Sequence, residues 1–370
     1  MAAKNVLGLI FSNAYDESVP ELTAMRTMGS VPFAGRYRLI DFPLSGMVNA
    51  GITQVGVFTN SNYHSLMDHI GNGSVWDLDR KREGLTLLPP FSNRESGMSD
   101  GKVSSLYGNI GYISDSAKDY VLLTDCNIIS KIDYEDMLKF SIEKNADVVE
   151  AYAEMIPSHL SKSTSFIIDE NGRITETNFV DSYDKKLNTS VNVILLRRTL
   201  LERLLHEANS KRISDMETLF AKNLANLRVF GYKVEGYVKA IESVISYYEA
   251  SLDLLKPEVR NYLFSDDSPI YTKTGDRTPS KYGINAKVKE SLVADGCRIY
   301  GEVENCILFR GVTVAKGAKV KNSIIMQDTE IGENAKIECV ITDKDVKISS
   351  RKTLCGAENY PIYIGKGIVI

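Results

Sequence analysis

The chain has 370 residues, of which 43% are hydrophobic and 25% are charged, a composition typical of a globular protein long enough for two domains. Its formal net charge of -4 argues against binding to nucleic acid or to anionic membranes, because both need an extended basic surface. The five cysteines show neither CxxC spacing nor nearby histidine pairs, so we expect reduced thiols in a cytoplasmic protein, without a zinc site or a disulfide framework.

The first apolar run, Val6–Phe11, is too short for a signal sequence or a membrane span and predicts a buried strand. Strand-like runs then alternate with helix-like segments up to about residue 250, which favours an α/β fold with a mainly parallel sheet covered by helices. A helix is predicted to begin at Pro43, two residues after Asp41, and to stop at Gly51. The other runs are Gln54–Phe58, Tyr120–Thr124, Leu200–Ala208, Arg228–Val234 and Ile241–Leu255.

Residues 256–284 differ in composition from the chain on either side. They contain three prolines and two glycines, which mark a connecting segment. We therefore expect a first domain over residues 1–255, a linker over 256–284 and a second domain over 285–370.

The second domain has a short aliphatic repeat. Leu308, Val314 and Val320 are each followed 17 residues later by another aliphatic residue, at Ile325, Ile331 and Ile337. Steps of five or six residues with glycines nearby are typical of hexapeptide coils, in which each side of a triangular turn stacks one aliphatic residue inward. The sequence thus predicts a parallel β-helix of the left-handed hexapeptide type rather than a β-sandwich.

Residues 31–52, which begin Val-Pro-Phe-Ala-Gly-Arg-Tyr-Arg-Leu-Ile-Asp-Phe, resemble the VPFGGxYRLIDFxLSN stretch of ADP-glucose pyrophosphorylases (glucose-1-phosphate adenylyltransferases). The similarity continues at Trp76–Arg80, Leu88–Pro90 and Tyr247–Ala250, and in the β-helix. The resemblance implies a Rossmann-like nucleotidyltransferase domain, tetramers, and a place in glycogen biosynthesis.

The family reaction, as the resemblance implies it, joins glucose 1-phosphate to the α-phosphate of ATP and expels pyrophosphate. Such chemistry needs a glycine-rich loop around the phosphates, cationic side chains, and paired carboxylates for Mg²⁺, the cofactor expected for any bound nucleotide. After the first strand, where the family has GGxGxRL, this chain has Ser12 and Asn13 and no glycine before Gly29. The phosphate-binding loop is therefore expected to be lost.

Other family positions have changed as well. Met28 stands at the lysine of the RxKPAVPF motif, and Ser182 stands where a VEKP-type lysine is expected. Asp125 matches the first metal-holding aspartate, but Ala240 stands at its partner in YWRDVGT, which leaves a doubtful, residual metal site. Glu242 lies two residues further on, where its side chain is expected to point elsewhere.

Two candidate substrate-binding residues match the family. Arg26 is the arginine of the RxKPAVPF motif, and Ser190 matches the serine of ASMG, whose glycine is replaced in this chain. Apart from the residual Asp125, we assign no catalytic residue.

Loss of the chemistry at several sites within a retained scaffold is typical of a pseudo-enzyme. We therefore expect a regulatory subunit that lacks activity alone, forms a heterotetramer with a catalytic homologue, responds to a phosphorylated-sugar effector, and contacts neither nucleic acid nor membrane. One alternative is an active sugar-nucleotide pyrophosphorylase with an altered site, and another is a homomeric scaffold. A β-helix acyltransferase is disfavoured because no histidine lies in the β-helix to act as a base.

Overall fold

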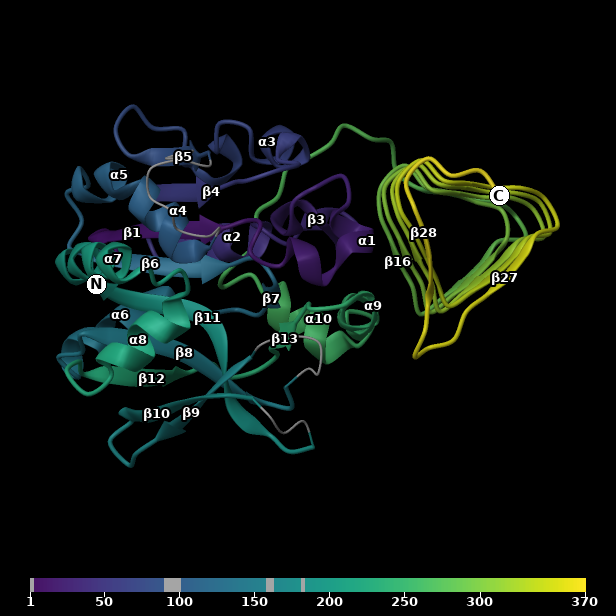
Figure 1. Cartoon of the computed structure of the whole chain (residues 1–370). Coiled ribbons are helices and arrows are strands. Elements are labelled where there is room, and N and C mark those ends of the chain that lie inside the picture. The colour runs from purple at the N-terminus through teal and green to yellow at the C-terminus, as the bar shows by residue number, and fades with distance from the viewer. Residues whose placement is uncertain (1–2, 90–100, 158–162, 181–183) are drawn as a thin grey trace.

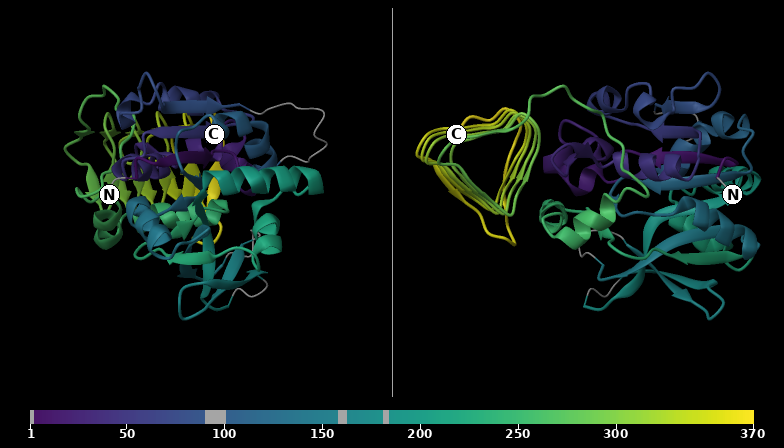
Figure 2. Two further views of the ribbon diagram at one scale, coloured as in Figure 1. Left: turned by 90° about the vertical axis from the view of Figure 1, so that its left-hand side faces the viewer. Right: turned by 180° about the vertical axis from the view of Figure 1, so that it is seen from behind.

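The computed structural model describes residues 3–89, 101–157, 163–180 and 184–370. An α/β body forms the N-terminal part, and the C-terminal part is a triangular coil of short strands. Figure 1 looks nearly along the axis of that coil, and Figure 2 shows the same arrangement from the side and from behind.

A nine-stranded sheet forms the centre of the α/β body, with the order β10-β9-β11-β6-β1-β4-β5 and with β8 pairing to β11 and β12. Strands β5, β4, β1 and β6 are mutually parallel, whereas β11 runs antiparallel to β6, β8 and β9. Their bounds are β1 (Val6–Phe11), β4 (Gln54–Phe58), β5 (Gly84–Leu88), β6 (Tyr120–Asp125), β8 (Val148–Met155), β9 (Thr164–Ile168), β10 (Ile174–Phe179), β11 (Leu187–Arg197) and β12 (Val229–Lys233).

Helices cover both faces of this sheet, which confirms the predicted α/β class. One face packs on α2 (Asp41–Asn49), α6 (Tyr134–Glu143) and α9 (Val244–Asp253), and the other packs on α4 (Lys102–Gly108), α5 (Ile110–Ser114), α7 (Arg198–Lys211) and α8 (Met216–Asn223). The remaining helices are α1 (Pro20–Thr23), α3 (His64–Ile70) and α10 (Pro257–Leu263), with 3₁₀ turns at Asp16–Ser18, Met28–Ser30 and Ser74–Trp76. Two further short antiparallel pairs are β2 (Pro32–Phe33) with β3 (Tyr37–Arg38), and β7 (Ile128–Ile129) with the distant β13 (Lys239–Ala240).

Three five-stranded parallel sheets form the C-terminal coil, as the aliphatic repeat predicts. Leu308 pairs with Ile325, Val314 with Ile331, and Val320 with Ile337, so each 17-residue step is one turn of the coil. The sheets are β14 (Lys281–Tyr282), β17 (Arg298–Ile299), β20 (Thr313–Val314), β23 (Glu330–Ile331) and β26 (Lys347–Ile348); β15 (Lys287–Lys289), β18 (Glu302–Glu304), β21 (Lys319–Lys321), β24 (Lys336–Glu338) and β27 (Thr353–Cys355); and β16 (Leu292–Val293), β19 (Ile307–Leu308), β22 (Ile324–Ile325), β25 (Val340–Thr342) and β28 (Ile362–Ile364).

The β16-β19-β22-β25-β28 sheet of the coil packs against the α/β body. Its residues Ile307, Ile324 and Ile341 belong to the same apolar cluster as Tyr247 and Tyr248 of α9. The Tyr248 hydroxyl also donates a hydrogen bond to the Asn322 carbonyl at 2.5 Å. The two parts therefore share one buried interface.

The segment expected to be a linker, residues 256–284, contains α10 and β14 and otherwise follows an irregular path. The helix predicted from Pro43 begins two residues earlier, at Asp41. Within the described ranges, no helix is long and apolar enough to span a membrane.

Candidate functional site

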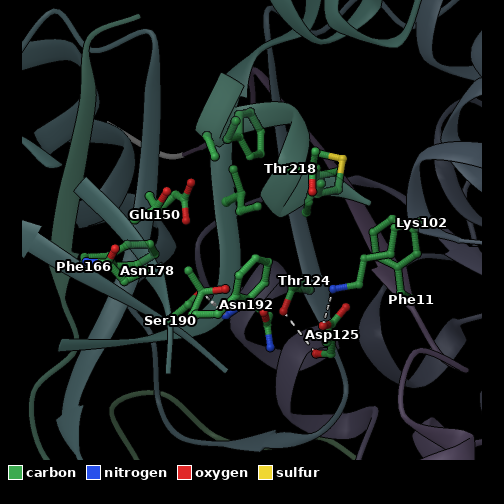
Figure 3. Close-up of a pocket in the computed structure, with 18 of the residues that line it drawn as sticks. Phe11, Lys102, Thr124, Asp125, Glu150, Phe166, Asn178, Ser190, Asn192 and Thr218 are labelled. Atoms are coloured by element: carbon green, nitrogen blue, oxygen red, sulfur yellow. Dashed lines mark hydrogen bonds and ion pairs between the residues drawn. The ribbon is translucent and has the colours of Figure 1, made fainter. Parts of the chain in front are cut away.

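The crossover in the parallel half of the sheet places a cavity at the carboxyl ends of β1 and β6. From β1 the chain continues to β4 on one side and returns later to β6 on the other, which is the point where ligands bind in open α/β sheets. Phe11 and Asp125, the last residues of these strands, pair in register. Both line a cavity of about 350 Å³, called here the Asp125 cavity (Figure 3).

Asp125 is buried in this cavity and forms an ion pair. The Nζ of Lys102, the first residue of α4, lies 2.6 Å from its Oδ2. The Asp125 side chain is 1% exposed and the Lys102 side chain 22%. The retained aspartate therefore has a cationic side chain as its neighbour (Figure 3).

Ala240, the counterpart of the family's second metal-holding aspartate, lies on β13 beside Ile128 of β7. It lines a second cavity of about 530 Å³, called here the Ala240 cavity, together with Glu242. The lining of the Asp125 cavity includes neither residue. Among the described residues, no group of three histidine, cysteine or acidic side chains is placed to hold a metal. Because the Lys102 ammonium pairs with Asp125, and Ala240 and Glu242 line the other cavity, the residues present do not fit a Mg²⁺ site.

The loop after β1 is filled by its own side chains. The Ser12 hydroxyl donates to the Phe58 carbonyl at 2.7 Å, and the Asn13 side-chain oxygen accepts from the Asn60 backbone N–H at 2.9 Å. Asn13 also donates to the carboxylate of Asp16. These side chains stand where the family loop has glycines, which let the backbone N–H groups approach a phosphate closely.

Met28 is buried, and its backbone N–H donates to Asp16 Oδ1 at 2.6 Å. Burial raises the pKa of Asp16 to about 6 against the opposing effect of this hydrogen bond. The position where the family has a lysine is thus joined to a carboxylate of the loop.

The pairing of β11 with β8 is interrupted between Ser190, which pairs with Tyr152, and Ile194, and Asn192 lies within this interruption. Asn192 has φ of 55°, a left-handed conformation that asparagine adopts more readily than most side chains. This explains how asparagine can replace the family glycine. The Ser190 hydroxyl accepts the Asn192 backbone N–H at 3.1 Å, and both residues line the Asp125 and Ala240 cavities.

Arg26 lies away from both of these cavities, at the interface with the β-helix. One of its terminal nitrogens is 2.8 Å from each carboxylate oxygen of Asp343, and both side chains are at least 95% buried, with exposures of 4% and 5%. The Tyr363 hydroxyl donates to the same carboxylate at 3.0 Å. The predicted substrate-binding arginine therefore joins the two parts of the chain. Ser182 lies outside the described residues.

A third cavity, which sequence reasoning did not identify, lies between the two parts and is rich in cations. Its volume is about 260 Å³, and it is called here the inter-domain cavity. Its charged lining residues are Arg36, Arg38, Asp68, Lys273, Arg277, Arg310 and Lys344, with His69.

Burial lowers the pKa of two of these cations. It lowers the pKa of Arg38 to about 10 and that of Lys344 to about 8, where the positive charges of Arg38 and Arg26 act in the same direction on Lys344. Several partly desolvated cations around one hollow form a surface that an anion would stabilise. The sequence offered one signal, the two arginines of Arg36-Tyr37-Arg38, but their partners Arg310 and Lys344 come from the distant β-helix.

Known proteins resemble this chain over both parts. The family model "Nucleotidyl transferase" matches residues 19–176, and the model "GlmU-like, C-terminal hexapeptide" matches residues 278–359. The glycogen biosynthesis protein GlgD of Bacillus subtilis (strain 168) is 38% identical over 369 residues, which are 100% of this chain and 98% of that protein.

Two enzymes are similar over most of the chain. The glucose-1-phosphate adenylyltransferase of Clostridium perfringens (strain SM101 / Type A) is 33% identical, covering 87% of this chain and 84% of the enzyme. That of Geobacillus stearothermophilus is 34% identical, covering 86% and 84%. The chain belongs to the glucose-1-phosphate adenylyltransferase family and is a GlgD-like member of it.

Proposed function

We propose that this chain is a regulatory subunit of glucose-1-phosphate adenylyltransferase in glycogen biosynthesis. It assembles with a catalytic homologue, in a heterotetramer, and changes the rate at which that homologue makes ADP-glucose and pyrophosphate from ATP and glucose 1-phosphate. The chain alone does not convert these substrates.

The observation that carries this proposal is the filled loop after β1. The side chains of Ser12 and Asn13 bond to Phe58 and Asn60, at the end of β4 and just after it, and they obstruct the close approach of a triphosphate that glycines allow. Ala240 adds no carboxylate opposite Asp125, and Met28 adds no cation. Since electrostatic stabilisation is commonly the largest contribution to catalysis, losing these groups together removes the reaction while the fold is kept.

The inter-domain cavity supports a regulatory role. Its cations, among them Arg38, Lys344 and Arg310, match the charge of a phosphorylated sugar. They come from the α/β body and from the β-helix, so an anion bound among them contacts both parts of the chain. A ligand that bridges two parts favours the arrangement in which both sets of contacts are made.

The test measures pyrophosphate release with ATP, glucose 1-phosphate and Mg²⁺ by this chain, by the catalytic homologue, and by the mixture, across a panel of phosphorylated sugars. We expect no turnover by the chain alone, and a mixture whose rate or effector response differs from the sum. A mixture equal to the sum would contradict the proposal. Turnover by the chain alone would instead support an active pyrophosphorylase with an altered site.

Charge variants connect the test to the cavity. Arg38→Gln with Lys344→Gln should leave the complex intact and abolish its response to the phosphorylated sugar. Lys352→Gln, which removes an exposed charge of the β-helix outside the cavity, is the matched control and should leave the response unchanged.

A further inference from the structure

Asp125 is a carboxylate in a place that water hardly reaches. Its side chain is 1% exposed, at the end of a central strand and next to the ring of Phe11 in the paired strand. A buried carboxylate needs a nearby positive charge, because an uncompensated ion in such a site is costly. In an adenylyltransferase site that charge would be a divalent cation.

Lys102 supplies the charge in this chain. Its ammonium lies 2.6 Å from Asp125 Oδ2, and it is also 5.7 Å from the centroid of the Phe11 ring, where a cation is attracted to the aromatic face. A divalent cation bound to Asp125 would have to share the carboxylate with an ammonium at direct hydrogen-bond distance. Repulsion between the two cations disfavours that arrangement.

Polar residues such as Thr124 and Asn178 line part of the Asp125 cavity, but the aromatic part of its wall offers no ligand to a hydrated metal ion. Magnesium keeps several water ligands and near-octahedral geometry, which requires polar surroundings on several sides. The lining includes the aromatic residues Phe11, Phe166, Phe179 and Phe220. Ala240 and Glu242 line the other cavity. Glu150 is a second carboxylate in the lining of the Asp125 cavity, but the Lys102 ammonium pairs with Asp125.

We propose that Lys102 is a built-in counter-ion that occupies the place of the divalent cation at Asp125, so that the Asp125 cavity does not bind metal. The inference goes beyond the regulatory role, because a regulatory subunit could equally well bind metal and nucleotide without turnover. Lys102 is a positioning residue here: it holds the carboxylate and, through its place at the start of α4, ties that helix to the end of β6.

The probe is Mn²⁺. Electron paramagnetic resonance distinguishes free from bound Mn²⁺ and so measures the affinity of the full chain for it. We expect wild type and Asp125→Asn to bind Mn²⁺ equally weakly, since Asp125 is not available to it. The variant Lys102→Met removes the ammonium and leaves the Asp125 carboxylate in place. Its affinity for Mn²⁺ should rise about tenfold, as expected for a carboxylate that loses a competing cation.

Lys222→Met is the matched control, because it removes an exposed lysine from the same lining while leaving the pair with Asp125 intact. It should not increase Mn²⁺ affinity. Wild-type protein that binds Mn²⁺ more tightly than Asp125→Asn would overturn the proposal. This comparison needs neither lysine variant, so it decides the matter even if Lys102→Met does not fold, and it is independent of the assay of the mixed subunits.

Discussion

Asn192 donates a hydrogen bond from Nδ2 to the hydroxyl of Tyr15, across 2.6 Å and 177 positions of sequence. Tyr15 belongs to the loop that replaces the glycine-rich loop of the family, and Asn192 replaces a family glycine on β11. Both replacements line the Ala240 cavity, and Asn192 also lines the Asp125 cavity. Two substitutions at separate family positions thus meet in one contact beside both cavities.

The contact between Tyr15 and Asn192 should contribute modestly to stability. Tyr15→Phe removes one hydrogen bond and should lower the free energy of unfolding by about 1 kcal/mol. Asn192→Ala loses the same bond and places a less tolerant residue at positive φ, so it should cost about 1–2 kcal/mol more. Asn192→Gly allows the positive φ without strain, so its change in the free energy of unfolding should resemble that of Tyr15→Phe. Urea unfolding measures all three, and equal values for alanine and glycine would contradict the role of the backbone.

The ion pair between Arg26 and Asp343 should be far more sensitive to single substitutions. Asp343→Asn leaves a buried arginine without its counter-charge and should lower the free energy of unfolding by about 3–5 kcal/mol. Arg26→Met with Asp343→Leu removes both charges and should be milder than either single variant. A double-mutant cycle from denaturant unfolding gives the coupling between them.

The matched comparison is the exposed pair of Lys211 and Glu207 on α7, for which a coupling of about 0.3–0.5 kcal/mol is expected. Coupling at Arg26 and Asp343 no larger than this would show that the pair does not join the two parts of the chain energetically.

Lys344 should make anion binding depend on pH. Its folded pKa is lowered to about 8, below that of an unfolded lysine, so the folded protein releases this proton first as the pH rises. Because the unfolded chain then holds more protons, stability should rise with pH between about 8 and 10.5 as the buried charge is relieved. The affinity of the inter-domain cavity for an anion should fall as the pH rises through the same range, because Lys344 loses its positive charge.

Calorimetric titration of inorganic phosphate between pH 7 and 9 measures this effect. Lys344→Gln should bind more weakly at pH 7 and lose most of the pH dependence. Lys352→Gln, whose charge lies outside the cavity, should keep the wild-type profile. A wild-type affinity that stays constant across this range would exclude Lys344 as the titrating group.

The features that could be predicted from the sequence are those that depend on periodicity or on the residue type at one position. The 17-residue step from Leu308 to Ile325 predicted the coil because inward aliphatic residues must stack one turn above another. The end of the strand at Asp125 indicated a ligand site because the carboxyl ends of parallel strands face a common crevice. Both depend on local rules that a single segment obeys.

Contacts between distant segments were not predictable in this way. Arg26 and Asp343 are 317 positions apart, and no sequence pattern around either residue indicates that they pair. The inter-domain cavity collects cations from four separate stretches of the chain, which the packing of the β-helix brings together. The strand β11 was not among the predicted runs, so its antiparallel direction was not predicted either. Asn192 is different: asparagine at a family glycine is a readable signal for positive φ.

Restoring the family residues should not restore activity while Lys102 remains. The restored chain carries Ala240→Asp, Met28→Lys, Ser182→Lys and a glycine-rich loop over residues 12–16, which also removes Tyr15. We expect no pyrophosphate release with ATP, glucose 1-phosphate and Mg²⁺, because the Lys102 ammonium still occupies the Asp125 carboxylate. Adding Lys102→Ala frees that carboxylate for the metal and should produce measurable turnover.

Asp125→Asn in the same fully restored background should abolish that turnover again, which ties the gain to the metal site rather than to the loop. Activity that appears before Lys102 is replaced would mean that the ammonium moves aside for the metal at little cost. The order in which activity returns therefore separates two causes of inactivity. One is the absence of family groups, as at Met28 and Ala240, and the other is the Lys102 ammonium, which takes the place of the metal at Asp125.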